Sequence, residues 1–294
     1  MIFFSKYLNA PLYSAKRALS LNQLYLMSFF CLVSLYACQS SVSKRPIDDL
    51  ALNHFLNKSS IYLYGRKPYA KEITEAKWFF SEKGFTQPSR EEYLMKMSST
   101  NEYKLYLYQL GRNDLMNFIF NPDTVEIQNT IHVWTKLYPN DYGKKEIVRL
   151  KRLLTISQDL LNDSLDNIGL HKRLVHNSYY DFINMGTENF VISMYNNFLD
   201  RPPTKYELTQ GKLMVDGSDA LFLGKKGSSK EDFIAMFFDS YLYYEGQVRM
   251  LYKRYYYTEP PAEYLTALTL EYYKTKNLRK IQTKLLSGDL LIAA

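Results

Sequence analysis

The chain has 294 residues, 46% of them hydrophobic, which is enough for one or two domains with cores of their own. It contains 27 Tyr and only 12 Gly, a composition that favours packed helices over a many-stranded sandwich. Without residues 1–37, Lys and Arg would number 34 against 30 Asp and Glu. The remaining charge of about +4 is too small to indicate nucleic-acid binding.

The first 38 residues have the pattern of an export signal. Three basic residues precede an apolar run from Leu24 to Cys38, which is short for a membrane-spanning helix and has the length of a signal-peptide core. The run ends in the letters LYAC, and this ending resembles the lipobox of bacterial lipoproteins. The resemblance implies cleavage before Cys38, lipidation of Cys38 and stable membrane attachment through several acyl chains. An ordinary cleaved signal and an uncleaved anchor are the alternatives.

Cysteine usage supports the same interpretation. The only other cysteine, Cys31, lies inside the apolar run, so the mature domain would contain no disulfide, thiol nucleophile or thiolate metal site. Residues 38–47 are polar and would form a short tether. We expect a lipid-anchored protein of the cell envelope, in the outer membrane and facing the periplasm.

A phrase of the form Arg-x-Pro-x-x-x-Glu occurs twice, 135 residues apart. Its defining residues are Arg66, Pro68 and Glu72 in the first copy and Arg201, Pro203 and Glu207 in the second. Apolar residues at helical spacing follow each Glu, with a small residue, Ala76 or Gly211, on the same face. Each phrase therefore predicts a helix, a tight Pro turn and a second helix that another helix can approach closely.

Helix-start signals accompany both copies. Ser89 and Ser229 each precede an acidic residue by three positions and are expected to cap the next helix. Thr204 and Glu207 form a further capping box, whereas Tyr69 takes the Thr place in the first copy, so the cap there should be weaker.

A third, degraded copy begins 57 residues after the second and has lost both the Arg and the Glu. Residues 105–190 also show amphipathic helical spacing, and no alternating run is long enough to build a sheet. The prediction is an all-α fold of tandem helical-hairpin repeats packed as an irregular multi-helix bundle. The expected segments are a signal peptide (1–37), a lipidated tether (38–47), a first repeat (48–110), connecting helices (111–185), a second repeat (186–245) and a third repeat (246–294).

A helix that ends in the pattern Y..L.R.P, followed by T..E and later by F...L..S..Y, resembles repeat modules of bacterial envelope proteins of unknown function, and more faintly the linker domains of phycobilisomes. The resemblance covers about 50 residues per copy. It implies binding to other proteins and transfers no catalytic residue.

Two interpretations of Arg66 and Arg201 remain. Each guanidinium could bind a carboxylate or phosphate of a ligand, or could pair with its own Glu or with carbonyls at a helix end. Recurrence at the same turn, and the joint loss of Arg and Glu in the third copy, favour a structural pair.

Other groups give weaker signals. His171 and His176 would lie about 140° apart on a helix, so no metal site is expected, and no cofactor either. Residues 223–232 lack the order of a phosphate-binding loop and are expected to form a mobile basic loop. The clusters of tyrosines suit protein or sugar contacts. The residues of this possible contact site are Arg254, Tyr255, Tyr256 and Tyr257.

These features predict a non-enzymatic, lipid-anchored scaffold or adaptor that binds the membrane and another envelope protein, and no nucleic acid. The alternatives are a glycan- or peptidoglycan-binding lipoprotein that uses exposed tyrosines and, from another class, an envelope hydrolase with scattered carboxylates. No Gly-x-Ser-x-Gly motif occurs, and adjacent acids such as Glu91 and Glu92 point in different directions on a helix.

Overall fold

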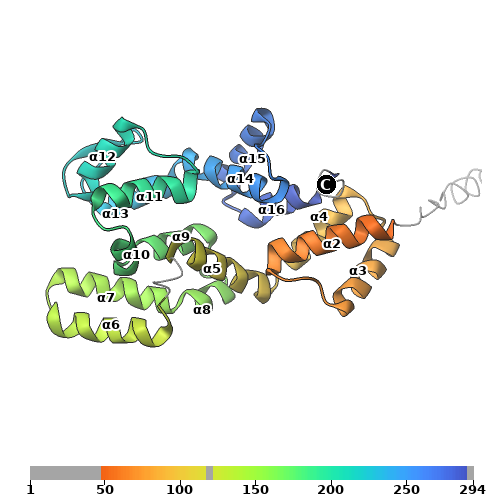
Figure 1. The fold of residues 1–294 in the computed structure, drawn as a ribbon, viewed down its shortest axis with the longest axis horizontal. Coiled ribbons are helices and arrows are strands. Elements are labelled where there is room, and N and C mark those ends of the chain that lie inside the picture. The colour runs from red at the N-terminus through yellow and green to blue at the C-terminus, as the bar shows by residue number, and fades with distance from the viewer. Residues whose placement is uncertain (1–47, 117–121, 290–294) are drawn as a thin grey trace, which may run out of the picture. The chain divides into compact units, whose positions relative to one another are not determined.

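The computed structural model describes residues 48–116 and 122–289. Within these parts the chain forms fifteen helices and a single two-stranded hairpin, so the predicted all-α multi-helix bundle is confirmed (Figure 1). The expected signal peptide, the lipidation site Cys38 and the tether 38–47 all lie outside the described residues. Over the same two ranges, none of the helices has both the length and the apolar character needed to cross a bilayer.

Four helices at the N-terminal end of the described chain make up what we call the first module. They are α2 (Asp49–Tyr64), α3 (Ala70–Lys83), α4 (Gln87–Met97) and α5 (Asn101–Met116). The chain turns between α2 and α3 at Pro68, and between α3 and α4 near Gly84, the residue that ends α3. The Pro residue cannot continue the first helix because it has no N–H to donate, but its fixed φ suits the approach to the next.

Four later helices form the second module, with a hairpin between the second and third of them. These elements are α11 (Thr187–Leu199), α12 (Lys205–Val215), β1 (Ala220–Phe222), β2 (Lys225–Gly227), α13 (Lys230–Asp239) and α14 (Tyr241–Tyr256). The strands pair antiparallel, with Ala220 opposite Gly227. The expectation of a mobile basic loop at 223–232 was therefore wrong, since most of this stretch belongs to the hairpin and to the start of α13.

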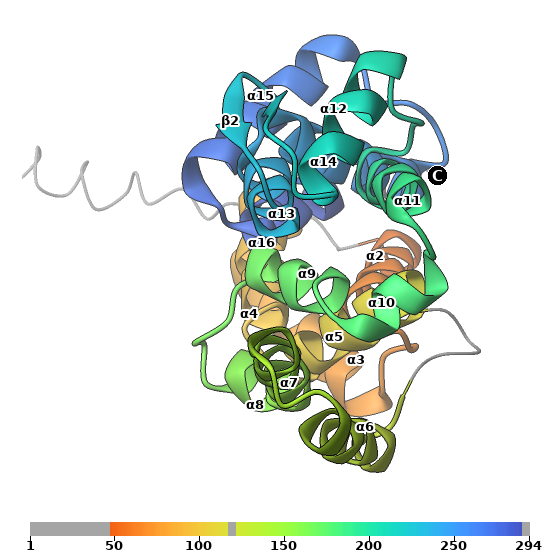
Figure 2. The same cartoon turned by 90° about the vertical axis from the view of Figure 1, so that its left-hand side faces the viewer.

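The remaining helices connect the modules and end the chain. They are α6 (Thr124–Leu137), α7 (Asp141–Leu154), α8 (Ile156–Leu161), α9 (Asn167–Val175), α10 (Ser178–Ile183), α15 (Ala262–Thr275) and α16 (Leu278–Ser287). Helices α6 and α7 lie side by side as a hairpin (Figures 1 and 2). Helices α8 and α9 pack on α5, while α16 packs on α4 of the first module.

The two modules bury matching positions of their first helices. Five buried positions of α2 each have a buried counterpart 135 residues later, in α11. The matched pairs of α2 and α11 are Phe55 with Phe190, Leu56 with Val191, Ser59 with Met194, Ser60 with Tyr195 and Leu63 with Phe198. In the second helices, the small residues Ala76 and Gly211 also match and are both buried. A Cβ on Gly211 would lie 3.0 Å from Val191 and from Phe233, which shows how closely these helices approach.

The turns share a backbone conformation as well as a sequence. Helices α2, α11 and α14 all end at a residue in the left-handed region, namely Gly65 (φ 72°), Asp200 (φ 55°) and Tyr257 (φ 57°). These residues are spaced by 135 and 57 positions, as in the sequence repeat. Helix α14 therefore closes the second module and also opens the third copy, which continues through α15 and α16.

Gly65 illustrates how each module accommodates its own side chains. A Cβ at Gly65 would lie 2.3 Å from the ring of Tyr106 on α5. In the second module the arrangement is reversed, because Asp200 stands in the place of Gly65 and Gly246 in the place of Tyr106. A Cβ at Gly246 would lie 2.2 Å from the carbonyl oxygen of Phe198. In each module, one glycine lets the first helix end against the fourth.

One predicted cap was misplaced. Helix α4 begins three residues earlier than expected, so that Thr86 is the N-cap and Ser89 lies within the first turn. Thr86 is a favourable N-cap residue, and Pro88 in the first turn costs no hydrogen bond. The backbone N–H of Thr86 donates to Ser89 Oγ at 3.0 Å. In the second module Ser229 is the N-cap of α13, and its Oγ accepts from the N–H of Asp232 at 3.1 Å.

Candidate functional site

The two Arg-x-Pro turns contain closely similar ion pairs. The Arg66 guanidinium donates to both carboxylate oxygens of Glu72 at 2.9 and 2.8 Å, and Arg201 donates to those of Glu207 at the same two distances. Each arginine also donates to the carbonyl of the following residue at 3.0 Å. Arg66 additionally donates to Glu102. The guanidinium groups therefore bind groups of their own chain.

The glutamates also cap the helices that follow the turns. Glu72 accepts from the N–H of Tyr69, and Glu207 accepts from that of Thr204, each at 2.7 Å. Thr204 completes a capping box by accepting from the N–H of Glu207, whereas Tyr69 supplies no side-chain cap. The hydrogen bond from Arg66 lowers the pKa of Glu72. Burial raises the pKa of Glu207, but the hydrogen bonds from Arg201 and Thr204 outweigh it and lower that pKa to about 2.

The four residues of the predicted aromatic contact site do not share one exposed surface. Tyr255 is buried, with its hydroxyl 3.0 Å from the amide nitrogen of Gln282, so its assignment to an exposed surface was wrong. Tyr256 is half-buried and donates to the carbonyl of Leu285. The reason is helical periodicity, because three consecutive residues at a helix end cannot all face solvent when that helix packs against another. Only Arg254 and Tyr257 of this set are exposed, and Arg254 lies 3.3 Å from Asp114.

The histidines with the largest pKa shifts belong to the packing of the connecting helices. His171 is enclosed between Phe198, Phe238 and Tyr243, and its Nδ1 lies 2.8 Å from the Tyr243 hydroxyl. Burial lowers the pKa of His171, and also that of His176, to about 4. Among the described residues, no three His, Cys, Asp or Glu side chains gather in an arrangement that could hold a metal ion.

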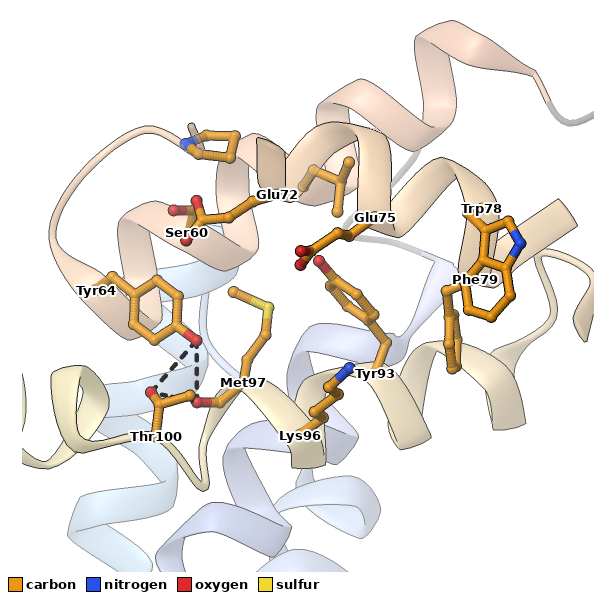
Figure 3. Close-up of a pocket in the computed structure, with 12 residues that line it drawn as sticks. Ser60, Tyr64, Glu72, Glu75, Trp78, Phe79, Tyr93, Lys96, Met97 and Thr100 are labelled. Carbon is orange, nitrogen blue, oxygen red and sulfur yellow. Dashed lines mark hydrogen bonds between the residues drawn. The ribbon is translucent and has the colours of Figure 1, made fainter. Parts of the chain in front are cut away.

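A cavity lies in the first module, between α2, α3 and α4, and we call it the hollow (Figure 3). Its volume is about 480 Å³. Its walls combine aromatic, aliphatic and charged side chains. The residues that line it are Leu56, Ser60, Tyr64, Pro68, Glu72, Glu75, Trp78, Phe79, Tyr93, Lys96, Met97 and Thr100.

Polar groups reach into the hollow from all three helices. Figure 3 shows the carboxylate of Glu75 and the hydroxyl of Tyr93 pointing toward one another. The hydroxyl of Tyr64 donates to the Met97 carbonyl at 3.1 Å. Ser60 Oγ is buried and makes no hydrogen bond in the structure. A buried hydroxyl without a partner costs about 1–3 kcal/mol, so a ligand that supplied one would gain that energy.

The rim of the hollow carries a large exposed ring. Trp78 on α3 is 70% exposed, although tryptophan side chains are highly buried on average. It stands beside Phe79 at one end of the hollow (Figure 3). An exposed tryptophan next to a cavity is typical of contact sites for other molecules.

The equivalent space in the second module is filled by that module's own side chains. Tyr195 replaces Ser60 and is buried, with its ring centroid 5.5 Å from that of Phe237. Phe233 replaces Tyr93 and stacks on Phe222 of the β-hairpin at 4.6 Å. In the third copy the matching position is Tyr252, which is also buried. The first module alone has a small residue at this position among the three copies.

The turns were predicted from the sequence, whereas the hollow was not. Its residues Ser60, Trp78 and Tyr93 belong to no motif, and their side chains are common in helices. The signal that could have found them is the repeat itself, because aligning the copies through the Arg-x-Pro turn places Ser60 against Tyr195 and Tyr252. A serine where the other copies bury a tyrosine indicates a vacancy in the first module.

A comparison with protein-family models, curated proteins and solved structures finds no match to this chain. The fold and the site describe a helical protein with repeated modules, the first of which contains the hollow. Glu72, at the wall of the hollow, is paired with Arg66.

Proposed function

We propose that this protein is a lipid-anchored adaptor of the bacterial envelope, without catalytic activity, that holds another envelope protein at the hollow of its first module. The observation that carries the proposal is the difference between the copies. The first module has Ser60 and a cavity at the position where the other two copies bury Tyr195 and Tyr252. A vacancy kept in one copy alone is suited to an occupant from outside the chain.

The chemistry of the hollow favours binding over catalysis. Glu72 accepts hydrogen bonds from both terminal nitrogens of the Arg66 guanidinium and from the N–H of Tyr69, which stabilise its ionised form. An acid with a lowered pKa is poorly suited to donate a proton at neutral pH. The aromatic walls and the exposed Trp78 supply apolar contact area to a partner.

The attachment to the envelope rests on the N-terminal pattern. An acylated Cys38 followed by a short tether would hold the module near a membrane surface and keep its hollow accessible to membrane-associated proteins. Replacing Cys38 with Ala should release the chain from the membrane fraction in bacterial cells, while the wild type stays with that fraction. Release of both proteins would contradict the anchor.

Site-specific photo-crosslinking in living cells tests the adaptor role. A photoreactive phenylalanine derivative at Trp78 of the full chain should give one discrete protein adduct in the membrane fraction. The matched control is Leu213, which occupies the equivalent position on α12 and is 40% exposed. Equal adducts at both positions, no adduct at either, or an adduct with cell-wall glycan alone would refute the proposal.

A further inference from the structure

The other two copies show what the space in the first module accepts. At the position of Ser60 they carry the same residue, tyrosine, and both tyrosines are buried. Tyr195 and Tyr252 therefore act as two independent examples of an aromatic ring bound inside this type of module. Their surroundings can be compared with the walls of the hollow residue by residue.

The neighbours of Tyr195 correspond to the walls of the hollow. Its ring packs on Phe237, which takes the place of Met97. The Cζ atom of Arg201, the equivalent of Arg66, lies 5.1 Å from the centre of the ring. Burial and the nearby Glu207 carboxylate, the equivalent of Glu72, raise the pKa of the Tyr195 hydroxyl. The phenol thus lies between an aromatic or aliphatic wall and the Arg–Glu pair of its turn.

Tyr252 occupies a related environment. Its ring lies 6.0 Å from that of Tyr264, which stands where Glu72 and Glu207 stand in the other copies. In both of these copies the tyrosine is therefore directed toward the residue four positions after the proline of the turn, which is Glu207 in the second copy and Tyr264 in the third. The same direction in the first module leads into the hollow, toward Glu72.

The hollow has the size and the groups that a phenol requires. An apolar cavity of about 150 Å³ is enough to bind a benzene molecule, and the hollow is about three times larger. Tyr64, Phe79 and Tyr93 offer ring faces and edges for aromatic packing. The carboxylates of Glu72 and Glu75 and the unpartnered Ser60 Oγ can accept a hydrogen bond from a phenolic hydroxyl.

We propose that the occupant of the hollow is a tyrosine side chain of the partner protein, inserted in trans where the other copies insert their own Tyr195 or Tyr252. This inference rests on the proposed adaptor function and adds the chemistry of the contact. The partner's ring would lie against the aromatic walls, with its hydroxyl at the polar groups and the flanking peptide on the rim near Trp78.

The probe for this proposal is p-cresol, which is the side chain of tyrosine without its backbone. Calorimetric titration of the full chain with p-cresol should show one site, with toluene, which lacks the hydroxyl, binding at least fivefold more weakly. The Ser60→Tyr variant should bind p-cresol at least tenfold more weakly because its own ring occupies the space. The Ser60→Ala variant leaves the space open and removes only one of the hydrogen-bond acceptors, so it should bind p-cresol more weakly than the wild type but more tightly than Ser60→Tyr.

A reverse variant supplies an independent check. Tyr195→Ser opens the matching space in the second module and should raise the stoichiometry for p-cresol from one site to two. If this variant does not fold, the comparison of Ser60→Tyr with Ser60→Ala still decides the question. No binding to the wild type, equal binding to Ser60→Tyr, or toluene binding as tightly as p-cresol would overturn the inference.

The outcomes separate this inference from the adaptor proposal. Binding of p-cresol without a crosslinked adduct at Trp78 would keep the phenol specificity of the hollow and refute the adaptor. A crosslinked adduct without p-cresol binding would keep the adaptor and refute the tyrosine.

Discussion

The pairing of Arg201 with Glu207 makes stability depend on pH in a way that can be calculated. The carboxylate accepts hydrogen bonds from the guanidinium at two oxygens and from the N–H of Thr204, and its side chain is only 14% exposed. Its pKa falls from an ordinary 4.5 to about 2 in the folded protein. A difference of this size corresponds to about 3 kcal/mol of stabilisation by the ionised form.

The sign of the effect follows from the direction of the shift. Because the folded-state pKa lies below the unfolded one, the stabilisation is complete above about pH 4.5 and disappears as the pH falls toward 2. Glu207→Gln imitates the protonated acid, so it should lower the free energy of unfolding by about 3 kcal/mol at pH 7 and by much less near pH 2. Arg201 is 37% exposed and stays hydrated in the variant.

Urea unfolding followed by circular dichroism, at several pH values between 7 and 2, measures this difference. Glu263→Gln, in the first turn of α15, is the matched control and should change the free energy by less than about 0.5 kcal/mol. A Glu207→Gln variant as stable as the wild type at pH 7 would contradict this prediction, and so would a difference in unfolding free energy that stays constant on acidification.

Three further predictions concern other parts of the chain. Gly65→Ala should lower the free energy of unfolding by about 3 kcal/mol, because its φ is left-handed and its Cβ would meet the Tyr106 ring. In a Tyr106→Ala background the same substitution should cost about half as much in the same urea titration. Arg90 is 4% exposed, and its Nε donates to the Ser287 carbonyl at 2.9 Å. Arg90→Met should therefore destabilise the contact of α16 with α4 by about 2 kcal/mol and speed amide hydrogen exchange in α16. Unchanged exchange in α16 would contradict this. Radiolabelled palmitate should be incorporated by the wild type and lost in Cys38→Ala, and equal labelling would refute the lipobox assignment.

The sequence contained enough information for the fold class and for the repeated turn. Each turn depends on residues that lie close together in the sequence, namely Pro68 or Pro203 and the Arg–Glu pair beside it. Local signals of this kind can be recognised without tertiary structure. The cap of α4 was misplaced by three residues because Thr86 and Ser89 are both acceptable N-caps, and only the backbone path selects between them.

The hollow could not be predicted from periodicity, because it depends on which side chains meet across three helices. Tyr255 shows the same limit, since its burial depends on contacts with Gln282 on α16 and with Tyr62 on α2. Composition identifies a tyrosine-rich helix but does not reveal which rings face another helix. The repeat alignment offered the one available clue to the hollow, the serine that takes the place of a tyrosine.

The free energy of unfolding of the Ser60→Tyr variant tests the vacancy in the first module most directly. Inserting a large ring at a buried helix position normally costs about 1–3 kcal/mol. If the space is open as in Figure 3, the new ring should enter it and leave the protein as stable as the wild type or more stable by about 1–2 kcal/mol. The neighbouring Ser59 is buried outside the walls of the hollow, so Ser59→Tyr should show the ordinary loss. Equal losses in both variants would contradict our account.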